Sequence, residues 1–132
     1  MSDHVASVQA IYAAFGRGDV PAFLAHLDED VDWEHDWGSP PLSIYTPRRG
    51  RAEVAKFFAA LHAIEITRFE PINLLAGGNQ VAAVIRLGLT VKATGQAVTD
   101  LEMHLWTFGT DGKVTGLRHI CDTHQLARAG LV

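Results

Sequence analysis

The chain has 132 residues, a formal net charge of −4 and one cysteine, Cys121, which suits a single domain over residues 1–132 without an intramolecular disulfide. Charges of both signs are scattered, and the densest basic stretch, residues 48–51, leads into Glu53 rather than aromatic residues, so we expect neither nucleic acid nor membrane as a partner. The N-terminal residues lack a basic, apolar leader and no apolar run reaches about 18 residues, which predicts a soluble cytoplasmic protein.

Helical spacing dominates the first third of the chain. Apolar residues at positions 5, 8, 12 and 15 place one stripe on a helix over about residues 3–16. Asp19 is expected to cap a short second helix, which tolerates Pro21 because an N–H in its first turn has no intrahelical partner. Apolar residues at positions 54, 57, 58 and 61 predict a third helix over residues 51–63.

A period of two appears between the second and third helices. Apolar or aromatic residues at positions 31, 33, 35 and 37 alternate with acidic residues at 32, 34 and 36. This pattern predicts a strand whose apolar face carries His35 together with Trp33 and Trp37. Residues 37–50 contain three prolines and no periodicity, which indicates an irregular loop beside a pocket.

The rest of the chain is rich in strand patterns. We expect strands in residues 64–75, 80–93, 97–108 and 113–122, because glycine-bearing turns separate these stretches and favour antiparallel hairpins. Within residues 80–93 every odd position from 81 to 91 is apolar, whereas the other face includes Arg86, Thr90 and Lys92. Asp122 is expected to cap the turn or short helix that follows.

This order of elements predicts an α+β fold. Three N-terminal helices would pack on a curved mixed, mostly antiparallel β-sheet and enclose an apolar pocket, so that the molecule resembles a cone. The mixed outer face of the sheet would suit a symmetric sheet-to-sheet contact, and we expect a homodimer through it.

Three histidines stand in separate apolar segments: His35, His104 and His119. Imidazole exchanges protons near neutral pH, so these side chains are the candidate catalytic residues if they converge on one pocket. Glu102, two residues before His104 on the same strand face, is a candidate hydrogen-bond partner. Six residues are expected to contact a ligand: Tyr12, Trp33, Trp37, Glu102, Trp106 and Cys121.

Four segments taken in order carry a family resemblance: FGRGDVPAFLAHLDEDVDWEHDWGSPP, RRGRAEVAKFF, HLWTFGTDGKVTGLRHI and CDTHQLARAG. Nearly the whole chain thereby resembles the SnoaL-like branch of the nuclear transport factor 2-like (NTF2-like) superfamily, with its ketosteroid isomerases, limonene epoxide hydrolases and polyketide cyclases. The resemblance implies the cone-shaped fold. It leaves function open, because this fold hosts many chemistries.

The resemblance also implies roles for single positions. WEHDWGS is similar to the isomerase segment that holds the general-base aspartate, and His35 stands at that position. MHLWTF resembles the strand of the oxyanion-stabilising aspartic acid, which is a histidine in the cyclases, and His104 takes that place. GLRHI is similar to the cyclase segment with the acid/base aspartate, which falls on His119 if the preceding turn is one residue longer. The isomerase tyrosine falls on Ile11, beside Tyr12, so we expect the isomerase hydrogen-bond pair to be absent and steroid isomerisation not to occur.

Taken together, these features predict an enzyme of the isomerase or cyclase type that uses histidine general acid/base catalysis. It would transfer protons at a carbon next to a carbonyl group of a small apolar ligand, without a metal or other cofactor. Three alternatives stay open: a zinc site made by the three histidines, epoxide hydrolysis by Asp100 and Glu102 with Arg86 or Arg118, and a non-catalytic ligand-binding or dimerisation module.

Overall fold

The computed structural model describes residues 3–35 and 42–131. Its helices and strands follow one another in this order: α1 (His4–Gly16), α2 (Val20–Leu24), β1 (Leu27–Trp33), the 3₁₀ helix η1 (Ser43–Tyr45), β2 (Arg48–Arg49), α3 (Arg51–Ala60), the 3₁₀ helix η2 (Leu61–Ala63), β3 (Ile64–Gly77), β4 (Gln80–Val91), β5 (Ala97–Phe108), β6 (Val114–Ile120) and α4 (Thr123–Arg128). None of these helices is long and apolar enough to cross a membrane.

The six strands form one mixed sheet in the order β2-β1-β6-β5-β4-β3. The strands from β3 to β6 are antiparallel because short turns join them, and Gly78 and Gly112 take the left-handed backbone that such turns need (φ 57° and 82°). β1 pairs with β6 in parallel, since a long crossover separates them along the chain. The predicted α+β class with a mostly antiparallel sheet is confirmed.

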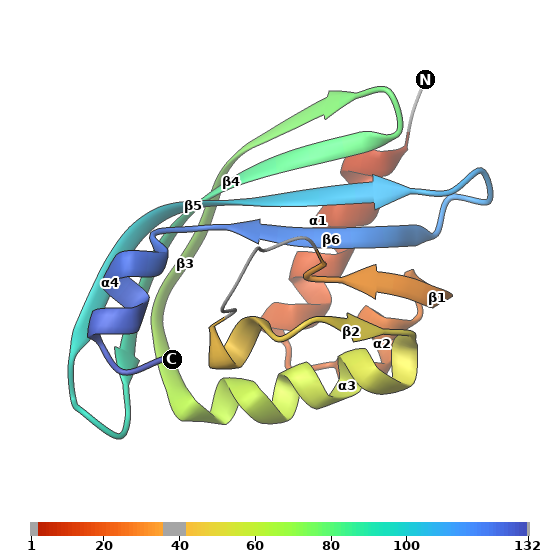
Figure 1. Cartoon of the computed structure of the whole chain (residues 1–132). Helices are drawn as coiled ribbons and strands as arrows, with labels where there is room; N and C mark the ends of the chain where they lie inside the picture. The colour runs from red at the N-terminus through yellow and green to blue at the C-terminus, as the bar shows by residue number, and fades with distance from the viewer. Residues whose placement is uncertain (1–2, 36–41, 132) are drawn as a thin grey trace.

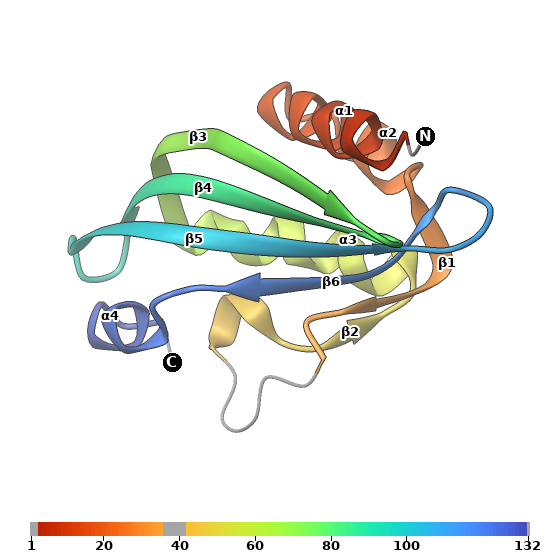
Figure 2. The same ribbon diagram turned by 90° about the horizontal axis from the view of Figure 1, so that it is seen from above.

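Helices α1, α2 and α3 pack against the inner face of the curved sheet, and α4 lies at the far end of the long strands (Figures 1 and 2). On β4 the odd residues from Val81 to Val91 are buried against these helices, as the alternation predicted. Asp19 and Asp122 cap α2 and α4, because their carboxylates accept hydrogen bonds from the backbone N–H groups of Ala22 and Gln125. The predicted third helix ends as the 3₁₀ turn η2.

The first strand departs from its prediction at its C-terminal end. β1 stops at Trp33, and Glu34 takes a left-handed backbone (φ 63°) that a residue with a side chain rarely adopts. The Glu34 N–H still donates to the Leu117 carbonyl of β6 at 2.9 Å. Alternation therefore breaks at Glu34, and the predicted continuation through Trp37 is wrong for His35; Trp37 itself lies outside the described residues.

The outer face of the sheet exposes large apolar side chains. Leu75, Leu101 and Ile120 are 54%, 58% and 49% exposed. The strand registers place them on the outward face with the even residues of β4, among which Arg86 pairs with Leu101. We propose that a second copy of the chain covers this face, as the sequence pattern predicts for a homodimer.

The oligomeric state tests this proposal. Light scattering coupled to size exclusion should give twice the mass of the chain for the wild type and the single mass for Leu101→Arg, because the new charge would lie beside Arg86 in a symmetric contact. Ala13→Arg, an exposed position on α1, is the control and should leave the dimer intact. A monomeric wild type would exclude the dimer.

Candidate active site

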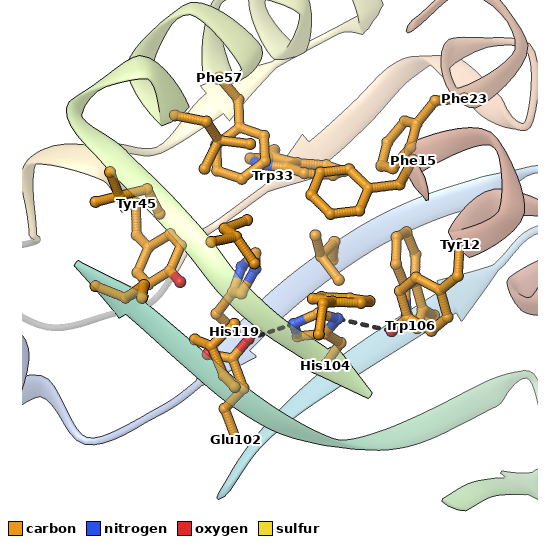
Figure 3. A pocket seen from close by; sticks show the side chains of 17 residues that line it. Tyr12, Phe15, Phe23, Trp33, Tyr45, Phe57, Glu102, His104, Trp106 and His119 are labelled. Atoms are coloured by element: carbon orange, nitrogen blue, oxygen red, sulfur yellow. Dashed lines mark hydrogen bonds and ion pairs between the residues drawn. The ribbon is translucent and has the colours of Figure 1, made fainter. Parts of the chain in front are cut away.

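A cavity lies between the inner face of the sheet and the helices α1, α2 and α3 (Figure 3). Its lining is aromatic and aliphatic apart from a few polar groups: Tyr12, Phe15, Phe23, Trp33, Tyr45, Phe57, Leu61, Ile64, Ile66, Phe69, Leu87, Leu89, Glu102, His104, Trp106, Leu117 and His119. The space open to water-sized molecules is about 50 Å³, room for about four waters at about 10–15 Å³ each. An organic ligand must therefore displace part of the aromatic lining.

Two of the three candidate histidines meet in this cavity. His104 on β5 and His119 on β6 stand opposite each other in the strand register, with ring centroids 4.4 Å apart. Both are almost fully buried, at 4% and 6% exposure. In Figure 3 they lie across the cavity from the aromatic rings of the helices, Phe15, Phe23 and Phe57. Strand pairing thus places His119 beside His104.

His35 does not join this pair. Its side chain is 41% exposed and its Nε2 lies 3.7 Å from a carboxylate oxygen of Asp32, away from the cavity lining. The left-handed Glu34 backbone turns the chain, so that Glu34 enters the interior where alternation placed His35. The expectation that His35 points inward with Trp33 is wrong, and the zinc site of three histidines falls with it.

A chain of hydrogen bonds holds His104. The Trp106 indole N–H donates to the Tyr12 hydroxyl at 3.0 Å, the Tyr12 hydroxyl lies 2.6 Å from His104 Nδ1, and His104 Nε2 lies 2.8 Å from Glu102 Oε1. Glu102, predicted as a neighbour of His104, is 2% exposed. Ile11, the position that the family resemblance selected, is buried in the core, whereas the neighbouring Tyr12 reaches His104 from α1.

A second carboxylate holds His119. Glu34 is fully buried, and its Oε1 accepts hydrogen bonds from the backbone N–H and from ring Nδ1 of His119 at 2.8 and 2.6 Å. Tyr45 of η1 stacks on the other side of the imidazole, with ring centroids 4.2 Å apart. These contacts fix the orientation of the ring, which lies close to Glu102 and His104.

The two imidazoles differ in electrostatics. Burial lowers the pKa of His104, and the neighbouring positive charge of His119 lowers it further despite the contact with Glu102. Burial also acts to lower the pKa of His119, but the charge and hydrogen bond of Glu34 outweigh it and raise that pKa above its ordinary value. Burial alone would raise the pKa of Glu102, whereas the hydrogen bond and charge of His104 and the charge of His119 bring it below its ordinary value.

Of the described residues predicted to contact a ligand, four line the cavity and one does not. Tyr12, Trp33, Glu102 and Trp106 line the cavity as expected. Cys121 does not line it, because β6 ends at Ile120 and the alternation with His119 stops there. Burial raises the pKa of the Cys121 thiol, so the thiol stays protonated.

Sequence patterns missed Glu34 and Tyr45. Glu34 belongs to the acidic positions of the alternating segment, and Tyr45 to the aperiodic loop, so that no periodicity marked either residue as interior. The family resemblance pointed to the WEHDWGS segment but selected His35, its neighbour.

Glu102, His104 and His119 form the group of described residues whose spacing suits a metal ion, with one ligand atom from each lying within 4.8 Å of the others. Two histidines and a carboxylate are a common ligand set. Both nitrogens of His104 are, however, engaged by Tyr12 and Glu102 at hydrogen-bond distance. A metal would have to break the His104–Glu102 contact, so the residues present do not fit one and we assign no metal here.

The family model described as "SnoaL-like domain" matches residues 8–117. An NTF2-like protein from Burkholderia xenovorans LB400 is similar in structure, with a TM-score of 0.84 and 31% sequence identity over 96% of this chain and 95% of its own. A search of curated proteins finds no match.

Two more distant structures share the fold. A proposed polyketide cyclase from Pseudomonas putida KT2440 has a TM-score of 0.76 and 24% identity over 93% of this chain and 94% of its own. TerC, co-crystallised with polyporic acid, has a TM-score of 0.81 and 24% identity over 97% of this chain and 98% of its own.

The opposite pKa directions of the two imidazoles are directly testable. In an NMR titration His119 should lose its proton above pH 6.5 and His104 below it, since 6.5 is the ordinary value for both. Glu34→Gln should lower the pKa of His119 because the carboxylate charge is lost. The reverse order of titration would contradict the assigned contacts.

The contact between Glu34 and His119 also makes the stability of the fold depend on pH. Because the folded-state pKa of His119 is raised, its contribution is full below about pH 6.5 and is lost as pH rises through the folded pKa. Glu34→Gln should therefore lower the unfolding free energy more at pH 6 than at pH 9, as measured by urea denaturation.

Proposed function

The chain belongs to the SnoaL-like domain family, and we propose that it is a small-molecule enzyme of the isomerase or polyketide cyclase type. It would transfer protons at a carbon next to a carbonyl group, inside an apolar pocket. One observation carries this proposal: two imidazole–carboxylate pairs converge on the wall of a cavity that is otherwise lined by aromatic and aliphatic side chains. The proposed polyketide cyclase and the polyporic acid complex among its structural neighbours support an organic substrate.

His119 is the proposed electrophilic group. Its Nδ1 is held by Glu34, and its raised pKa favours a proton on Nε2. An N–H at this position can donate to a substrate carbonyl oxygen and stabilise the negative charge that develops there when the α-proton leaves. The surrounding aromatic rings leave space for only a few water molecules, and this apolar environment strengthens the interaction.

The base of the proposed reaction belongs to the His104–Glu102 pair. Both side chains line the cavity on β5, next to His119 on β6. Enolate formation needs one group that accepts a proton and one that supports the oxygen, and such groups work best when their environments drive their pKa values apart. The opposite pKa shifts in this cavity meet that requirement.

A second candidate function is ligand binding without catalysis. The apolar lining of the cavity favours it, and the two buried imidazole–carboxylate pairs can specify the fold around such a cavity without taking part in a reaction. Trp33 and Trp106 line the cavity, so quenching of their fluorescence would report such binding.

Deuterium exchange separates the two functions. In D₂O the protein should accelerate α-proton exchange in at least one member of a panel of ketones and β-dicarbonyl compounds, followed by NMR. His119→Gln should lower that acceleration by about 10²–10⁴-fold, the usual contribution of an acid/base group. The matched control His124→Gln, an exposed histidine on α4, should retain the wild-type rate.

Quenching by panel compounds together with no accelerated exchange in any of them would replace the enzyme proposal by the binding function. Each variant needs an unchanged circular dichroism spectrum, since His119→Gln leaves Glu34 without its charged partner.

A further inference from the structure

The proton positions in the hydrogen-bond series Trp106–Tyr12–His104–Glu102 can be assigned from its donors. An indole N–H only donates, so Tyr12 accepts from Trp106 and its own O–H is free to point at His104 Nδ1. Nδ1 of a neutral His104 then accepts, and Nε2 carries the ring proton and donates it to Glu102 Oε1. Every polar side-chain atom in this hydrogen-bond series, from the Trp106 indole N–H to Glu102 Oε1, is thereby paired.

This hydrogen-bond series ends at Glu102, whose second carboxylate oxygen is unpaired among the described residues. Glu102 Oε2 is buried and has no hydrogen-bond partner among the described residues. An unpaired acceptor of this kind is costly when it belongs to a carboxylate, and native proteins rarely bury one without a purpose. Because Glu102 lines the cavity, a ligand there would be the partner for Oε2.

Neither imidazole can take the role of base in this arrangement. The lone pair on His104 Nδ1 accepts a hydrogen bond from Tyr12, and the Nε2–H group donates one to Glu102. His119 Nδ1 is engaged by Glu34, whose charge and hydrogen bond raise the His119 pKa and so favour a proton on Nε2 as well. The carboxylate oxygen of Glu102 is the acceptor that remains.

We infer that Glu102 is the catalytic base of the proposed reaction and that His104 is a positioning residue acting through it. The inference rests on the proposed function and revises the expectation that the histidines take the proton. The substrate C–H bond breaks, its proton forms an O–H bond with Glu102 Oε2, and the electron pair moves onto the carbonyl oxygen, which His119 supports. Return of this proton to another carbon completes isomerisation. If the Glu102 carboxyl first exchanges its proton with solvent, return of the solvent hydrogen to the same carbon completes exchange, and neither route needs an oxidant or reductant.

This base narrows the substrate class. A carboxylate with a lowered pKa is a weak base, so the carbon acid must be activated by a second electron-withdrawing group. The Trp33 indole N–H also has no partner among the described residues and belongs to the same cavity lining. With His119 it gives two donors for the two oxygens of a β-dicarbonyl compound.

Exchange with ethyl acetoacetate as the probe tests the inference. Glu102→Gln keeps the size and the acceptor for His104 but loses the base, and should lower the accelerated exchange by about 10²–10⁴-fold. Glu65→Gln is the matched control, an exposed glutamate on β3 outside the cavity lining, and should keep the wild-type rate. A folded Glu102→Gln variant with the wild-type rate would overturn the base assignment and leave the proposed function standing; a wild type inactive on the whole carbonyl panel would overturn both.

A measurement without substrate covers the case in which Glu102→Gln fails to fold. The titratable groups that interact with Glu102 are His104 and Asp100 on β5, His119 on β6, Tyr12 on α1, Tyr45 on η1 and Cys121 after β6. A carboxyl ¹³C titration of the wild type should show Glu102 ionised at neutral pH. Protonation of Glu102 near or above pH 7 would overturn the assignment.

The role of His104 has its own readout. His104→Phe keeps a planar ring but removes the hydrogen bond, so the carboxyl titration of Glu102 and the acid limb of the pH profile should both move to higher pH. A change in exchange rate without any shift in these two titrations would show that His104 is structural only.

Discussion

The burial of two carboxylates is the constraint on which the rest of this structure depends: Glu102 lines the aromatic cavity, and Glu34 contacts His119, which lines it too. Glu34 and Glu102 have almost no exposure to water, and removing an ionised group from water costs several kcal/mol unless charge and hydrogen bonds compensate for it. Each carboxylate has an imidazole within 2.8 Å that supplies both. His104 and His119 therefore stabilise the two buried glutamates, whether or not they also take part in a reaction.

The two pairs are unequal, and this inequality gives the cavity its chemistry. Glu34 gives one oxygen to two N–H groups of His119, which favours the charged imidazolium. Glu102 Oε1 accepts a single hydrogen bond from the Nε2–H group of a neutral His104, which is itself held by Tyr12. One pair thus presents a donor and the other an acceptor, at the spacing of neighbouring strands. The left-handed backbone of Glu34, which costs about 1–3 kcal/mol in proteins generally, brings the first carboxylate inward.

Much of this fold follows from local patterns in the sequence. The alternation along β4 and the glycine turns between β3 and β6 predict the sheet, and strand parity correctly places Glu102 and His104 on one face. The site is less predictable where the backbone departs from a regular element. Alternation selected His35 because it cannot anticipate a positive φ at Glu34, and Tyr45 comes from a segment without periodicity. Tyr12 lies one residue from the position that the family resemblance selected, a shift that only the packing of α1 on β5 decides.

The positions of protons in the cavity are the most direct test of this account. Neutron diffraction from crystals at neutral pH would locate the deuterium atoms on the side chains themselves. The account requires deuterium on His104 Nε2, on both ring nitrogens of His119 and on the Tyr12 hydroxyl, with Glu102 Oε2 bare. A deuterium bound to Glu102 Oε2 would contradict it.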